Sequence, residues 1–184
     1  MKASALIATA LLTSGHVYGA IIPEYQVIVD VSRLSTCPQA RSSKLYRLFN
    51  PDKESYAYTT SLSAAAAIPE EFEYDIVAAR LFETVQPSTV PLYHILNEDT
   101  LDSFYTRDPR ERDALLAQDL AYVDHGVAGY VFPRRVCGSR PFFRLFHREA
   151  KHHFYTTDQD EVDRMIFDEG YTGPVIAGFV ISAK

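Results

Sequence analysis

Tryptophan, a surplus of positive charge and any long apolar run beyond the first residues are missing from this sequence of 184 residues. Tryptophan is the ring best suited to stack on a sugar, so its absence counts against a lectin-like protein. The formal net charge is −6, and we expect no nucleic-acid partner because such a partner requires a basic face. After residue 20 no apolar run is long enough to span a bilayer, so we expect no membrane partner.

Motifs that would identify a catalytic or metal site are also absent. The chain has no Gly-x-Ser-x-Gly sequence, which carries the nucleophilic serine of many hydrolases. His147, His152 and His153 lie close in sequence, but adjacent residues of a strand point to opposite faces and cannot easily share one ion. The sequence therefore predicts a protein without enzymatic activity, cofactor or metal.

Residues 1–20 have the pattern of a secretory signal peptide. Lys2 provides a positive start, residues 3–12 form a short apolar run, and a cleavage site follows Gly19 or Ala20. The alternative is a buried N-terminal helix. Residues 21–44 are expected to form an N-terminal strand and a linker, with the strand at residues 24–31 pairing with the last part of the chain. The signal predicts a secreted, extracellular protein.

Two cysteines, Cys37 and Cys137, are the only thiols of the chain. In an oxidising compartment an even pair of cysteines favours a disulfide bond. The alternative is two free thiols. A disulfide between them would tie the segment that precedes the first hairpin to a linker late in the chain.

Three related segments, at about residues 45–84, 92–133 and 142–182, form the rest of the chain. Leu45, Leu92 and Phe142 align, and the positions that follow them align without a gap. In each segment two short runs rich in aromatic and β-branched residues flank a polar turn. This pattern predicts a β-hairpin in every segment.

A helix and a closing strand are predicted after each hairpin. The second and third segments have an aspartate followed three residues later by a glutamate, as in a capping box. These residues are Asp108 with Glu111, and Asp158 with Glu161. In the first segment Ser61 takes the cap position, and Pro69 is expected to shorten the helix. Gly129 and Gly178 in the closing strands are expected where the backbones of neighbouring segments pack closely.

The order of these elements predicts the fold class α+β. We expect a compact β-rich domain of three related hairpin–helix–strand repeats in a pseudo-threefold arrangement, spanning residues 45–184. Repeats of this length also suit the blades of a propeller, but three blades would be few and propeller blades lack a regular helix.

The motif LYRLFN, HFYTTDQDE, GY and VAGYVF resembles the secreted repeat domain catalogued as domain of unknown function family 5648. The resemblance covers residues 45–181. The first segment departs from it, with Ala57 where the others have Phe104 and Phe154. The resemblance implies an extracellular module of the kind that accompanies wall-degrading or proteolytic enzymes, and by analogy it favours a binding role.

Each hairpin combines a tyrosine with a long polar side chain. These candidate ligand-binding residues are Arg47 with Tyr58, His94 with Tyr105, and Arg144 with Tyr155. An aromatic face beside a hydrogen-bonding group suits a sugar ring, and three weak sites would gain affinity by multivalency on a polysaccharide. The alternative is that the tyrosines are core residues with satisfied hydroxyls.

The expected function is that of a secreted non-enzymatic binding module for cell-wall or extracellular carbohydrate, with a glycan or polysaccharide as partner. One alternative is a secreted scaffold-type interaction protein, an inhibitor or effector whose partner is an extracellular protein. Another is a hydrolase with an unrecognised carboxylate pair, which would require two carboxyl groups facing each other across a cleft.

Overall fold

The computed structural model describes residues 37–61, 63 and 71–182. The predicted signal peptide, the strand predicted at residues 24–31 and the helix predicted around residues 64–67 lie outside the described residues. No helix in the described part of the chain is long and apolar enough to cross a membrane.

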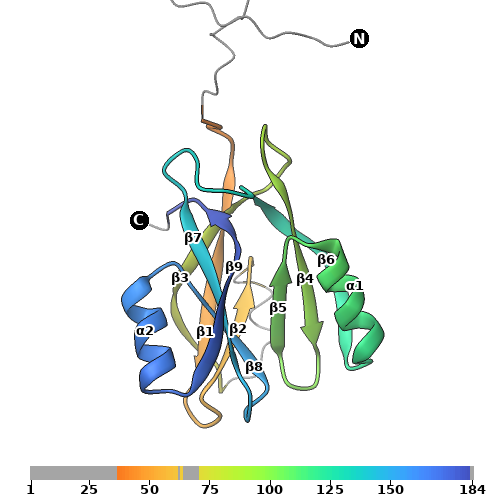
Figure 1. The fold of residues 1–184 in the computed structure, drawn as a ribbon, viewed down its shortest axis with the longest axis vertical. Coiled ribbons are helices and arrows are strands. Elements are labelled where there is room, and N and C mark those ends of the chain that lie inside the picture. Colours follow the sequence, from red (N-terminus) through yellow and green to blue (C-terminus); the bar gives the residue numbers. More distant parts are fainter. Residues whose placement is uncertain (1–36, 62, 64–70, 183–184) are drawn as a thin grey trace, which may run out of the picture. The chain divides into compact units, whose positions relative to one another are not determined.

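The described residues form nine strands and two helices (Figure 1). In chain order these are β1 (Ser42–Asn50), β2 (Ser55–Thr59), β3 (Glu73–Phe82), β4 (Val90–Asn97), β5 (Asp102–Thr106), α1 (Pro109–Gln118), β6 (Tyr122–Val131), β7 (Arg140–His147), β8 (His152–Thr156), α2 (Gln159–Phe167) and β9 (Tyr171–Val180). Six strands make one curled sheet in the order β2-β1-β3-β6-β4-β5, and three make a second sheet in the order β8-β7-β9.

The three predicted hairpins are confirmed as β1–β2, β4–β5 and β7–β8, each antiparallel. Each turn ends on a residue with positive φ, and these are Glu54, Leu101 and Lys151. The first two turns are also held by an asparagine side chain. Asn50 Oδ1 accepts from the N–H of Asp52 and Lys53, which is the way in which Asn stabilises a turn.

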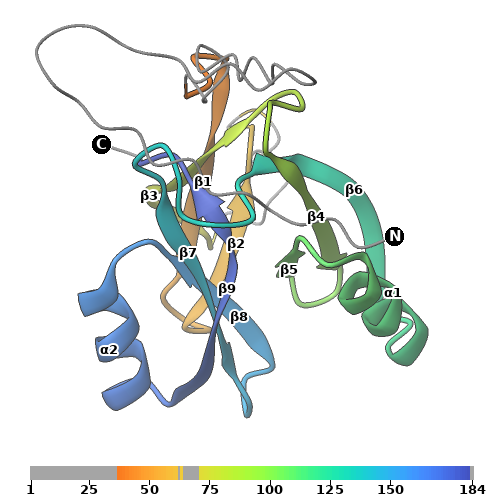
Figure 2. The ribbon, with the colours of Figure 1, turned by 45° about the horizontal axis from the view of Figure 1, so that its top comes forward.

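Both helices begin at the predicted caps. The Asp108 side chain accepts from the N–H of Arg110 at 2.9 Å, and Asp158 accepts from Asp160 at 2.9 Å. Pro109 occupies the first turn of α1, where its missing N–H costs nothing. The helices lie on opposite flanks of the strands (Figure 2).

The expected close packing at the strand glycines is confirmed. A Cβ atom added at Gly129 of β6 would lie 2.7 Å from Leu81 Cβ on β3, and one added at Gly178 of β9 would lie 2.7 Å from Val131 Cγ2 on β6. Any larger side chain would therefore force the strands apart at these two positions.

The predicted fold class, α+β with a pseudo-threefold arrangement, is wrong. Of the described residues 52% lie in strands and only 14% in helices, which fits a β-sandwich. The physical reason lies in how the closing strands pair. β3 pairs with β6 through Phe82 and Tyr130 and joins two hairpins into one sheet. Within the described residues, β9 and the residue after it pair with the larger sheet through isolated bridges alone, Arg80 with Ile181 and Phe132 with Phe179.

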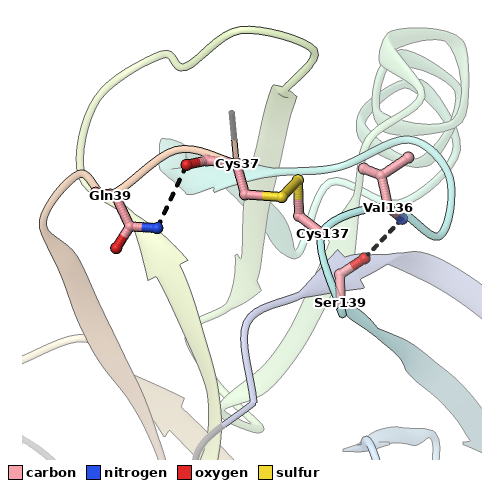
Figure 3. Close-up of a disulfide and its surroundings, with 5 residues drawn as sticks. All are labelled: Cys37, Gln39, Val136, Cys137 and Ser139. Atoms are coloured by element: carbon pink, nitrogen blue, oxygen red, sulfur yellow. Dashed lines mark hydrogen bonds between the residues drawn. A yellow bond between two sulfur atoms is a disulfide. The ribbon is translucent and has the colours of Figure 1, made fainter. Parts of the chain in front are cut away.

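The predicted disulfide between Cys37 and Cys137 is confirmed, with a Cα–Cα distance of 5.4 Å (Figure 3). It joins the segment before β1 to the loop between β6 and β7. That loop is fixed locally by the Ser139 hydroxyl, which accepts from the N–H of Val136 at 3.1 Å. The disulfide and the lack of a membrane-spanning helix among the described residues are compatible with a secreted protein.

Candidate functional site

The three tyrosines of the predicted site meet one another in the core. Tyr58, Tyr105 and Tyr155 are at most 4% exposed. Their ring centroids lie 5.2–6.2 Å apart, and each pair of rings packs edge to face. Burial raises the pKa of all three hydroxyls, so they stay protonated. The three rings therefore join the hairpins β1–β2, β4–β5 and β7–β8.

Two of the three hydroxyls accept a hydrogen bond from a backbone N–H group of a neighbouring edge strand. Tyr155 Oη accepts from the N–H of Tyr105 at 2.8 Å, and Tyr58 Oη accepts from the N–H of Tyr155 at 2.7 Å. Among the described residues no equivalent bond joins Tyr105 Oη to β2. The junction between β2 and the β4–β5 hairpin thus differs from the other two junctions.

We expect Tyr155→Phe to lower the free energy of unfolding by about 1–3 kcal/mol, because it leaves the buried Tyr105 N–H without an acceptor. Urea denaturation followed by circular dichroism measures the loss. Tyr130→Phe is the control, since the Tyr130 hydroxyl makes no hydrogen bond within the described residues. Equal stabilities of the two variants would contradict the assigned role of the Tyr155 hydroxyl.

A buried ion pair closes the junction between β1–β2 and β7–β8. Arg47 is 4% exposed, and its guanidinium contacts Asp75 at 2.6 Å and Glu161 at 2.6 and 3.1 Å. It also donates to the carbonyl of Tyr155 at 3.4 Å. Thr156 Oγ1 donates to the same Glu161 carboxylate at 2.5 Å. Arg47 is therefore engaged on every side by groups of the protein itself.

An analogous ion pair closes the junction between β7–β8 and β4–β5. Arg144 contacts Glu111 at 2.5 and 3.2 Å and donates to the carbonyl of Tyr105 at 3.1 Å. Burial acts to raise the pKa of Glu111 and Glu161, but their bonds to the arginines outweigh it and lower the pKa of both carboxyls. The capping-box role predicted for these glutamates is wrong, because their carboxylates face the neighbouring hairpin.

Five of the six predicted site residues thus lie in buried contacts between hairpins. They are Arg47, Tyr58, Tyr105, Arg144 and Tyr155. Their burial and their satisfied polar atoms agree with the alternative in which the tyrosines are core residues.

His94 occupies the remaining junction, between β4–β5 and β2, at the position that aligns with Arg47 and Arg144. Its half-buried ring stacks on Tyr105, with centroids 4.5 Å apart and an interplanar angle of 11°. His94 Nε2 and Ser103 Oγ share a hydrogen bond of 3.2 Å. Burial, reinforced by nearby His125, lowers the pKa of His94 to about 4. His94 is therefore neutral at pH 7.

No ion pair within the described residues includes His94. The position that aligns with Glu111 and Glu161 is an alanine in the sequence, Ala64. In the sequence alignment, His94 and Ala64 thus stand where the other two pairs have an arginine and a glutamate.

A cavity of about 430 Å³ lies at this junction. Its aliphatic lining is Ala57, Leu96, Leu101, Val127 and Ala128; its hydroxyls are Tyr58, Thr59, Thr60, Ser103 and Tyr105; its imidazoles are His94 and His125. The volume and the mixture of apolar surface with a few polar groups are typical of small-molecule sites. Of the predicted site residues it unites His94, Tyr58 and Tyr105, whereas Thr59, Ser103 and His125 were not predicted.

A buried carboxylate on the opposite side of β5 serves the fold. Asp102 accepts from the N–H of His153 at 2.6 Å, from His153 Nδ1 at 2.8 Å and from the Tyr122 hydroxyl at 2.5 Å. His152 instead shares a hydrogen bond of 2.6 Å with the Tyr171 hydroxyl. Within residues 37–61, 63 and 71–182, no group of three or more His, Cys, Asp or Glu side chains could hold a metal ion.

Acid should weaken the domain through Asp102. Burial acts to raise the pKa of this carboxyl, but the bonds from His153 and Tyr122 lower it on balance. The pKa of Asp102 is therefore lower in the folded protein than in the unfolded chain, where it is about 3.9. Its ionised form stabilises the fold at higher pH, and this stabilisation is lost as the pH falls through the unfolded and then the folded pKa. We therefore expect urea unfolding to show a smaller loss between about pH 6 and pH 3 for Asp102→Asn than for the wild type. Glu111 and Glu161 would supply the remaining loss, and an identical loss in the two proteins would contradict this role.

Comparison with known proteins identifies a family and no individual relative. No curated protein and no solved structure matches the chain. The family model described as Domain of unknown function (DUF5648) matches residues 44–181. Since this match covers well over half of the sequence, the chain belongs to the DUF5648 family.

Proposed function

We propose that this protein is a secreted, non-enzymatic module that binds carbohydrate of a cell wall or of extracellular material. The observation that carries the proposal is the cavity beside His94, at a junction where the part of the chain that the structure describes has no arginine–glutamate pair like those at the other two junctions. Its hydroxyls and imidazoles would bond the hydroxyls of a sugar, and its aliphatic side chains would cover the apolar face of the ring.

One further observation supports binding in place of catalysis, and another supports secretion. Among the described lining residues of the cavity there is no carboxylate, whereas glycoside hydrolysis generally needs two. The disulfide is typical of proteins that leave the reducing cytosol and suits the secretory signal expected at residues 1–20.

A secreted scaffold for a protein partner is the second candidate. It is favoured by the burial of Arg47, Tyr58, Arg144 and Tyr155, which the fold uses for its own stability. In that case the loops between the strands would carry the contacts, and the cavity beside His94 would have no ligand.

A binding screen of the oxidised protein against bacterial and fungal wall polysaccharides separates the two candidates. We expect saturable binding to at least one polymer, and His94→Ala should weaken it by about tenfold, as expected for losing one hydrogen-bonding ring from a pocket. His147→Ala is the matched control, because His147 does not line the cavity. Circular dichroism verifies that both variants fold. Absence of binding by the wild type, or equal effects of the two substitutions, would contradict the proposal.

A further inference from the structure

The cavity beside His94 differs from the cavity beside α2 in the charge of its lining. Among the described residues that line it there is no Asp, Glu, Lys or Arg. By contrast, the cavity of about 510 Å³ beside α2 is lined by Arg47, Arg164, Asp75 and Glu161 among others. The polar side chains among the described lining residues of the His94 cavity carry hydroxyls and imidazoles.

From this difference we infer that the cavity accepts uncharged sugar residues and rejects sugars that carry a carboxylate or a sulfate. The inference rests on the proposed carbohydrate function and specifies its ligand. A charged group that enters this cavity gives up its water and finds no counter-charge, and burying an unpaired charge is far more costly than burying a hydroxyl that gains a hydrogen bond.

The charges around His94 strengthen this discrimination. Asp102 of β5 and Asp124 of β6 both act on His94 electrostatically, and Glu98 in the β4–β5 turn lies 3.2 Å from His125 at the edge of the cavity. His94 itself carries no charge at pH 7, because its pKa is about 4. An anionic ligand would therefore lie near three carboxylates outside the cavity, and no lysine or arginine is among the described lining residues.

The hydrogen-bonding groups agree with a neutral, hydroxyl-rich ligand. The hydroxyl of Ser103 and the neutral ring of His94 can each donate and accept, and the Thr59 hydroxyl can accept. A sugar hydroxyl also donates and accepts, whereas a carboxylate can only accept. Thr59 and Thr156 occupy equivalent positions in their hairpins but bind different groups. The Thr59 hydroxyl donates to the Ser61 carbonyl at 3.1 Å, whereas the Thr156 hydroxyl donates to the Glu161 carboxylate.

The test compares matched oligosaccharides that differ only in charge. Cellohexaose, laminarihexaose and chitohexaose are each titrated by calorimetry beside a derivative in which one C6 hydroxymethyl group is oxidised to a carboxylate. Titrations at about 0.5 M NaCl screen the long-range repulsion by the negative net charge. We expect the neutral form to bind at least about tenfold more tightly than the oxidised form.

His94→Arg provides the second arm, because arginine is the residue at the aligned positions 47 and 144. A cation in the cavity should reduce the preference for the neutral form to less than about threefold, or reverse it. Wild-type binding of the oxidised form as tightly as the neutral form would overturn the inference, as would an unchanged preference in His94→Arg. Failure of every oligosaccharide and polysaccharide to bind would instead overturn the proposed function itself.

Discussion

Arg47→Ala will destabilise the domain by about 3–5 kcal/mol, the range typical of removing one partner from a buried ion pair. The loss is large because Asp75 loses this ion pair and Glu161 keeps only the more distant Arg164, at 3.8 Å, as a counter-ion. The guanidinium also lies 4.7 Å from the centroid of the Phe154 ring, so packing is lost together with charge. Urea denaturation at pH 7 measures the change in the free energy of unfolding.

Arg148→Ala is the control for this measurement. Arg148 lies exposed in the β7–β8 turn, and we expect its removal to change stability by no more than about 0.5 kcal/mol. A second comparison is the double variant Arg47→Met with Glu161→Leu, which removes the charges on both sides and should recover part of the loss. If Arg47→Ala were as stable as Arg148→Ala, the Arg47–Glu161 pair would not hold the junction.

Removal of the disulfide should have an effect of similar size. The sequence separation of Cys37 and Cys137 is 100, and closing a loop of that length stabilises a protein by about 4.7 kcal/mol in the chain-entropy model. The double variant Cys37→Ala with Cys137→Ala should therefore unfold at a markedly lower urea concentration, with a native circular dichroism spectrum before unfolding.

The reduced wild-type protein is the natural comparison for this double variant. Reduction and substitution should give unfolding midpoints that agree closely, because both act by removing the same cross-link. A reduced protein as stable as the oxidised one would mean that the disulfide does not constrain the unfolded chain.

Local elements of this fold could be predicted from the sequence, because local chemistry determines them. The caps at Asp108 and Asp158 depend on residues within one turn of a helix, and the close approach at Gly129 depends on the lack of a side chain. The division into two sheets could not be predicted in this way. It depends on the pairing of Phe82 with Tyr130, which lie far apart in the chain. Because the three closing strands have similar sequences, the sequence does not indicate which two of them pair.

The candidate site was predicted only in part for a related reason. Arg47, His94 and Arg144 align, so one common role was predicted for all three. Whether such a side chain is free or engaged depends on a carboxylate from a different segment. The signal was nevertheless present: the segment pairing with His94 has Ala64 at the position where Glu111 and Glu161 occur in the others. When both the arginine and the glutamate of such a pair are replaced, the two hairpins cannot form this ion pair. The replacement can be recognised in the sequence once it is known which segments pair.

The two tyrosine hydroxyls that accept backbone N–H groups have a consequence for behaviour at high concentration. Edge strands with free N–H groups can pair with other molecules and start aggregation. In this domain the N–H groups of Tyr105 on β5 and Tyr155 on β8 are occupied from within the molecule, and the Asp102 carboxylate occupies that of His153. These two strands are thereby protected from adding a strand of another chain, without the surface lysines or prolines that exposed edges commonly use.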